Sequence, residues 1–108
     1  MSDLFERGID CFNRGLWFEA HEIWEDLWNA TEGETRLFYQ GLVQVAVGLH
    51  HLSRGNLRGG RRVLERGLLK LQEYPAGYAG IDNRRLTIEL ESALRNAAVP
   101  TIRVHPSG

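Results

Sequence analysis

The 108-residue sequence predicts an all-α protein: a compact array of about five helices, built from two antiparallel helical hairpins and a closing C-terminal helix. Three observations support this prediction. Apolar residues recur at intervals of three and four along nearly the whole chain, as they do on one face of a helix. Glycine or proline separates the periodic segments. The apolar fraction of 43% and the charged fraction of 25% are those of one ordinary globular domain.

The first hairpin occupies the N-terminal quarter of the chain. Its first helix is predicted from about Asp3, a candidate N-cap, to about Arg14, and Gly15 is expected to end it. The second helix is predicted from about Trp17 to about Ala30. Such a short connection favours an antiparallel pair.

The second hairpin repeats this plan. Its first helix is predicted from about Glu34 to Ser53, with Gly55 as its end, and its second helix from about Leu57 to about Glu73. Proline cannot continue a helix, so the Pro- and Gly-rich segment that follows is predicted to be a loop.

The closing helix is predicted from about Asn83 to about Ala98, with Asp82 as its N-cap. We therefore expect one helical domain over residues 1–99 and a C-terminal tail over residues 100–108. Within that tail, residues 101–104 are a candidate extended piece.

The two hairpins match each other when the sequence is shifted by 40 positions. Small residues then fall on small ones: Gly8, Gly15 and Ala20 on Gly48, Gly55 and Gly60. Large apolar residues also coincide: Ile9, Phe12, Trp17, Ile23, Trp24 and Trp28 fall on Leu49, Leu52, Leu57, Val63, Leu64 and Leu68. This pattern resembles the two-helix unit of tetratricopeptide arrays, whose units are somewhat shorter. The alternative is that both hairpins obey the same packing rules without being repeats.

Several glycines lie inside the predicted helices, where each costs roughly 1 kcal/mol relative to alanine. They are Gly41, Gly48, Gly59, Gly60 and Gly67. Close approach of two helices is the expected reason for them.

Polar and aromatic residues form one dense cluster on the second and third predicted helices. On a helical wheel Trp17, Trp24 and Trp28 share a face, and tryptophans at this spacing are typical of a core. The polar members form two lines that are expected to face each other: His21 and Glu25, supported by Glu22, opposite Gln40, Gln44 and His51.

Three interpretations of this cluster stay open. It is a buried hydrogen-bond network that fixes helix register, a small-ligand or interaction site, or a metal or acid–base site formed by His21, Glu25 and His51. The string from His21 to Glu25 departs from the zinc-protease pattern His-Glu-x-x-His at the second ligand. No cofactor is predicted; a divalent metal is the alternative. The sequence also leaves open whether His50 or His51 joins the cluster.

The fourth predicted helix carries a basic stripe at four-residue spacing: Arg54, Arg58, Arg62, Arg66 and Lys70. Residues 16–35 instead hold six acidic side chains and no lysine or arginine. The stripe is a solvated face, a complement to the acidic helix within the chain or across a dimer, or a phosphate or RNA site. Nucleic acid is not expected, because no aromatic residue interleaves with the arginines and the formal net charge is −1.

A cytoplasmic protein is expected. Cys11 is the single cysteine, so there is no disulfide framework, and a lone cysteine among apolar residues behaves as a small hydrophobe. The first residues show no secretory pattern. The longest apolar stretch, Leu37 to Leu49, is shorter than the ~20 residues of a membrane span.

The string from Phe12 to Glu25, followed by Trp28, resembles a family of small bacterial and archaeal proteins catalogued as domain of unknown function 309. Further hallmarks are Gln40 to Gln44, His51, and Arg54-Gly55-Asn56 followed by Gly59-Gly60; the family more often has alanine at the last position. The resemblance covers about residues 5–75. It implies a compact all-helical fold and no particular activity. It points to His21, Glu22, Glu25, Gln40, Gln44, His51 and Asn56.

The leading functional hypothesis is a non-enzymatic interaction or scaffold protein that forms a homo-oligomer, with a dimer as the first expectation. Its partner is another protein or a small molecule. The alternatives are a metal-dependent or small-ligand enzyme centred on His21, Glu25 and His51, and an anion site at the arginine stripe.

Overall fold

The computed structural model describes residues 3–96 and Ile102. Those residues form five α-helices and one short 3-10 turn, with no β-strand among them: α1 (Asp3–Asn13), α2 (Trp17–Asn29), α3 (Thr35–Ser53), α4 (Leu57–Gln72), η1 (Tyr78–Gly80) and α5 (Asn83–Asn96). The all-α class and the five-helix array are confirmed. The predicted helix ends agree within one residue, except at the end of α5, where residues 97 and 98 lie outside the described part.

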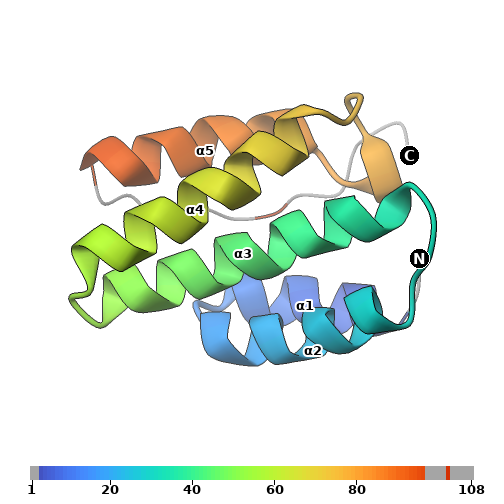
Figure 1. The fold of residues 1–108 in the computed structure, drawn as a ribbon, viewed down its shortest axis with the longest axis horizontal. Coiled ribbons are helices and arrows are strands. Elements are labelled where there is room, and N and C mark those ends of the chain that lie inside the picture. Colours follow the sequence, from blue (N-terminus) through green and yellow to red (C-terminus); the bar gives the residue numbers. More distant parts are fainter. Residues whose placement is uncertain (1–2, 97–101, 103–108) are drawn as a thin grey trace.

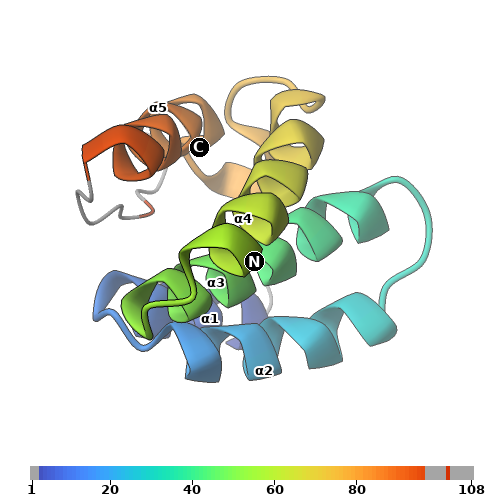
Figure 2. The same ribbon diagram turned by 60° about the vertical axis from the view of Figure 1, so that its left-hand side comes forward.

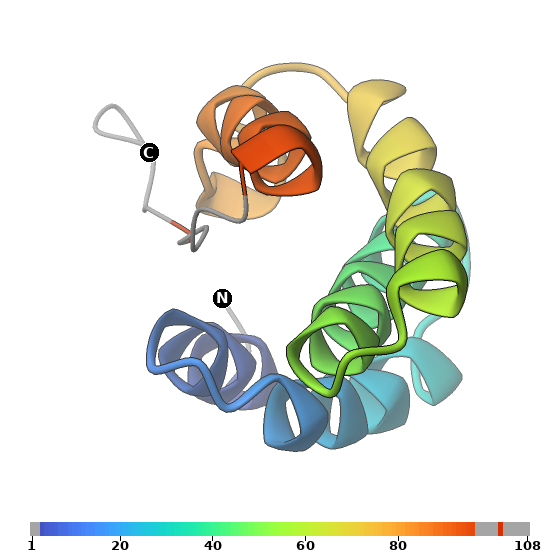
Figure 3. The same cartoon turned by 90° about the vertical axis from the view of Figure 1, so that its left-hand side faces the viewer.

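The helices form an arc in which each packs on its neighbours in sequence: α1 on α2, α2 on α3, α3 on α4 and α4 on α5. Figure 3 shows this arc from α1 at one end to α5 at the other. In Figure 2, α4 crosses α3, with α1 and α2 on one side of the pair and α5 on the other. No described helix is long and apolar enough to cross a membrane.

The two hairpins turn in the same way. Gly15 and Gly55 have φ angles of +78° and +86°, a backbone region that only glycine adopts at little cost. The Leu16 N–H donates to the Cys11 carbonyl at 2.9 Å, and the Asn56 N–H donates to the His51 carbonyl at 2.9 Å. Both bonds are those of a Schellman cap, 40 positions apart. The hairpins are therefore structural repeats at their turns.

Close packing repeats with the same offset. A Cβ atom at Gly8 would lie 2.0 Å from the indole nitrogen of Trp24, and one at Gly48 would lie 2.7 Å from the backbone nitrogen of Leu64. Trp24 and Leu64 are themselves 40 positions apart. Gly8 thus makes room for the Trp24 ring, whereas Gly48 makes room for the backbone of α4.

Other helical glycines extend the α3–α4 contact. A Cβ atom at Gly67 would lie 2.6 Å from the Gly41 carbonyl oxygen, and one at Gly60 would lie 2.9 Å from the Gly48 carbonyl oxygen. These contacts confirm close helix approach as the reason for those four glycines. Gly59 is different, because its nearest neighbour is the side chain of Asn56 in its own helix.

The core draws on every helix, and α3 is its centre. The largest fully buried side chains are Trp24, Phe5, Phe12, Phe38, Leu42, Leu64, Leu71, Ile81, Leu86, Leu90, Val45 and Asn83. Ile102 belongs to the same core and is 3% exposed, although it lies in the segment that we expected to be a tail. The rest of that segment, including the other residues of the candidate extended piece at 101–104, lies outside the described residues.

Candidate functional site

A cavity of about 160 Å³ lies where the first turns of α2 meet the last turns of α3. The two helices run antiparallel, so the α1–α2 and α3–α4 turns lie at the same end of the molecule (Figure 1). Five side chains line the cavity, and we call this site the histidine pocket: Phe18, His21, Val47, His50 and His51.

The rings in the histidine pocket contact one another in a row. The Phe18 ring centroid lies 5.3 Å from that of His21 and 5.2 Å from that of His50. The His50 and His51 centroids are 6.0 Å apart. Phe18 is 45% exposed, so solvent reaches one wall of the pocket. The site combines apolar walls with three imidazole rings.

His21 is held by its own helix. Its Nδ1 lies 3.2 Å from the Phe18 carbonyl oxygen, which can only accept, so this nitrogen carries the proton. Its Nε2 lies 3.5 Å from Glu25 Oε2, and this contact is an ion pair when the imidazole is protonated. No described residue makes a hydrogen bond to the His50 or His51 ring, so their nitrogens are free to bind a ligand.

Of the two expected polar lines, the structure brings His21 and His51 into one pocket, leaves Glu25 beside His21 but outside that pocket, and directs Gln44 elsewhere. The Gln44 side-chain oxygen accepts a hydrogen bond at 2.8 Å from Lys70, which is on α4. Gln40 is half-buried, Glu22 is exposed, and neither lines the pocket. Both His50 and His51 line the pocket, so both histidines belong to the site.

The tryptophans and Asn56 have packing and capping contacts. Trp24 is fully buried and its indole N–H donates to the Phe5 carbonyl at 3.4 Å. The Arg36 guanidinium lies 4.6 Å from the centre of the half-buried Trp28 ring. Asn56 caps α4 by accepting the Gly59 N–H at 3.2 Å. These contacts place all three side chains in the framework around the site.

The candidate metal ligands are not assembled as a metal site. Within the described part of the chain, no three His, Cys, Asp or Glu side chains are grouped so that they could hold an ion. Glu25 reaches His21 but lies outside the lining of the pocket that contains His51. The alternative of a metal centre at His21, Glu25 and His51 therefore gains no support from the geometry.

The arginine stripe lies on the outer face of α4, opposite its buried residues, except for Arg54, which is the C-cap residue of α3 and precedes the helix that was expected to carry it. The side chains of Arg54, Arg58, Arg62 and Arg66 are all exposed. Among the described residues they make no ion pair. The acidic helix α2 packs on α1 and α3, and no ion pair joins it to α4 in that part of the structure. Neighbouring Arg61 instead donates to the Leu94 carbonyl of α5 at 2.6 Å.

An aromatic cluster fastens the loop after α4 to the start of α3. The rings of Tyr74 and Tyr78 pack on Phe38 with centroids 5.0 and 4.9 Å away. Burial raises the pKa of Tyr39 and Tyr74 above the usual tyrosine value, and the nearby Tyr78 raises both further. Tyr39 and Tyr74 therefore stay neutral at physiological pH.

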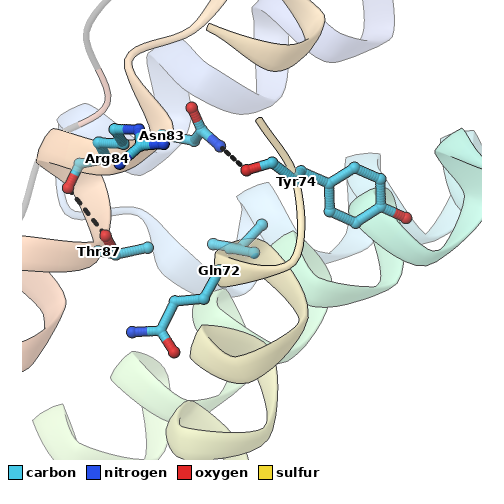
Figure 4. A pocket seen from close by; sticks show the side chains of 6 residues that line it. Gln72, Tyr74, Asn83, Arg84 and Thr87 are labelled. Carbon is cyan, nitrogen blue, oxygen red and sulfur yellow. Dashed lines mark hydrogen bonds between the residues drawn. The ribbon is translucent and has the colours of Figure 1, made fainter. Parts of the chain in front are cut away.

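A second cavity, of about 130 Å³, lies between α4 and α5 (Figure 4). The buried Asn83 closes the loop beside it: its amide nitrogen donates to the Tyr74 and Pro75 carbonyls, and its oxygen accepts the Gly77 N–H at 2.9 Å. Thr87 donates to the Arg84 carbonyl at 2.8 Å. The Asn83 and Thr87 side chains beside this cavity are thus bonded within the chain and hold the loop to the start of α5.

Sequence reasoning missed two members of the histidine pocket, Phe18 and Val47, and left open whether His50 or His51 belongs to it. On the helical wheel, His50 lies well away from His51. An imidazole side chain is long enough, however, for two histidines that are adjacent in sequence to line the same cavity. One sequence signal could have identified Phe18. It lies three positions before His21, and residues at this spacing are neighbours on one face of a helix.

A family model described as a domain of unknown function, DUF309, matches residues 5–63. An uncharacterized protein of Aquifex aeolicus is 30% identical over 94 residues, which are 86% of this chain and 28% of that protein. The uncharacterized protein YpuF of Bacillus subtilis is 30% identical over 79 residues, which are 70% of this chain and 45% of YpuF.

The chain thus spans less than half the length of these two relatives. The family match runs from α1 into α4 and contains the whole histidine pocket. It covers more than half of the chain and bears out the resemblance seen in the sequence. The chain belongs to the DUF309 family.

Proposed function

We propose that the protein is a non-enzymatic interaction module that binds a partner protein through the histidine pocket. The partner inserts one aromatic or branched apolar side chain between Phe18 and the imidazoles. The observation that carries this proposal is a cavity with apolar walls whose His50 and His51 rings have no hydrogen bond within the described structure.

The size of the pocket favours a single side chain over a metabolite. Small-molecule sites usually have about 300–1,000 Å³, whereas a cavity of roughly 150 Å³ holds one benzene ring. The histidine pocket, at about 160 Å³, matches the second value. Aromatic anchors in pockets of this kind contribute most of the affinity of many protein interfaces.

Two exposed apolar side chains lie at the pocket's end of the molecule. Leu16, which is 38% exposed, directly precedes α2, and Leu57, which is 62% exposed, is the first residue of α4. An interface core needs such uncharged surface around its anchor. The relatives support the same view, because in them this unit is a part of a longer protein.

Selection of phage-displayed peptides on the wild-type protein tests the proposal. Selected peptides are expected to share an aromatic or branched apolar residue. Their affinity should fall at least tenfold for Val47→Arg, because the new side chain fills the cavity. The matched control is Ile88→Arg, which introduces the same charge at an apolar residue that is 65% exposed on α5.

The control variant should bind the peptides as the wild type does. Equal binding by Val47→Arg, at unchanged helix content by circular dichroism, would contradict the proposal. A selection that yields no peptide above background on the wild type would contradict it as well.

Two further features belong to the proposal. A cytoplasmic location is consistent with the single cysteine. Self-association is supported by the acidic residues of α2 and the unpaired arginines of α4, which do not face each other within one chain. Opposite charges on separate faces can meet between two copies, and such contacts weaken as salt is added.

A further inference from the structure

Asn13, the last residue of α1, binds the backbone of Ile102, which lies 89 positions further along the chain. The Asn13 amide nitrogen donates to the Ile102 carbonyl oxygen at 2.8 Å, and the Ile102 N–H donates to the Asn13 side-chain oxygen at 2.6 Å. Two residues of neighbouring β-strands exchange the same two bonds. The Asn13 carboxamide therefore makes the two hydrogen bonds to the Ile102 main chain that a residue of a neighbouring β-strand would make.

The side chain of Ile102 supplies a second contact. Ile102 is 3% exposed and belongs to the hydrophobic core of the helical array. Main-chain hydrogen bonds combined with a pocket for one side chain are the means by which grooves bind extended peptides. Ile102 is held to the array in the manner of a peptide ligand.

The position of the Asn13–Ile102 contact in the fold also fits the interpretation of Ile102 as a bound peptide residue. Asn13 is exposed apart from this contact, at the end of α1, where the arc begins. Among the described residues, the end helices α1 and α5 do not form one of the extensive helix–helix contacts of the array. Ile102 is outside all helices and is therefore a separate element that completes the core.

We propose that the end of α1 and the core surface beneath Ile102 form a peptide-binding site, separate from the histidine pocket. In the absence of a partner, this site holds Ile102 of the same chain. An extended segment of a partner protein displaces it, with isoleucine or valine at the anchoring position. Proline is excluded from that position, because it lacks the N–H that Asn13 accepts.

The test uses the full chain with Ile102→Ser, which removes the anchor and leaves the site vacant. A fluorescent peptide with the sequence of residues 98–106 is titrated in and followed by anisotropy. The peptide should bind this variant at least tenfold more tightly than the wild type, whose own segment competes. The same peptide with aspartate or proline in place of isoleucine should not bind.

Asn13→Ala, added to the Ile102→Ser chain, should weaken peptide binding at least tenfold. The matched control is Asn29→Ala, an exposed asparagine at the end of α2, which should leave the affinity unchanged. Val47→Arg should also leave it unchanged, so the outcome is independent of the histidine pocket.

If Ile102→Ser lowers the helix content of the chain, the same peptide should restore it. The proposal is overturned if the peptide and its aspartate version bind alike, if Asn13→Ala has no effect, or if lost helix content is not regained. A wild-type dimer that Ile102→Ser dissociates would assign the site to a second copy and would also overturn it.

Discussion

Replacing Trp24 with alanine is expected to lower the free energy of unfolding by about 3–5 kcal/mol. Trp24 is the largest fully buried side chain, and its ring packs on Phe12 with centroids 5.7 Å apart. The substitution leaves a large cavity and removes the hydrogen bond to the Phe5 carbonyl. Chemical denaturation measures the loss, which is a large share of the roughly 5–15 kcal/mol of a typical domain.

Gly8 provides the control for this prediction. In the wild type, Gly8→Ala should cost about 1–3 kcal/mol, because the new Cβ atom would lie 2.0 Å from the Trp24 indole nitrogen. In the Trp24→Ala chain the same change should be neutral or stabilising by up to about 1 kcal/mol, since alanine is the better helix former. Equal costs in both backgrounds would contradict the assigned contact.

Gly48→Ala is expected to lower the free energy of unfolding by about 1–3 kcal/mol. The new Cβ atom would lie 2.7 Å from the Leu64 nitrogen and 2.9 Å from the Gly60 carbonyl oxygen. Both are backbone atoms, which cannot rotate away as a side chain does, so α3 and α4 must separate. Urea denaturation would measure the change.

Gly59→Ala is the matched control on α4. Its new Cβ atom would meet the Asn56 carboxamide, 2.9 Å away, and displacing this side chain would cost no more than the cap hydrogen bond to the Gly59 N–H, about 1 kcal/mol. This variant should therefore stay within about 1 kcal/mol of the wild type, with any gain coming from helix propensity. If both variants had the same effect, close backbone approach would not explain Gly48.

Much of the fold was predictable because its determinants are local or periodic. Gly15 and Gly55 end their helices through their own backbone conformation. The match of Gly8 and Trp24 with Gly48 and Leu64 at a shift of 40 also corresponds to residue pairs in contact, although Gly8 faces the Trp24 ring and Gly48 the Leu64 backbone. Such contacts join residues of one hairpin, and these can be read from the spacing alone.

The candidate site was predictable only in part, because it depends on contacts between hairpins. A wheel places His21 and His51 on their own helices, but the rotation of α2 against α3 decides that His50 and Val47 share the cavity. A wheel also does not choose between the neighbours of α3, and Gln44 turns toward Lys70 of α4 rather than toward α2. The contact between Asn13 and Ile102 joins distant residues without any periodic signal.

If the histidine pocket serves binding and is not needed for the fold, its histidines can be removed without unfolding the protein. The free energy of unfolding of His50→Ala tests this. His50 is half-buried and its ring contacts are Phe18 and His51, so we expect a loss of less than about 1 kcal/mol together with at least tenfold weaker binding of the selected peptides. A loss above about 2 kcal/mol, with unchanged peptide affinity, would contradict this expectation and make the imidazole row part of the architecture.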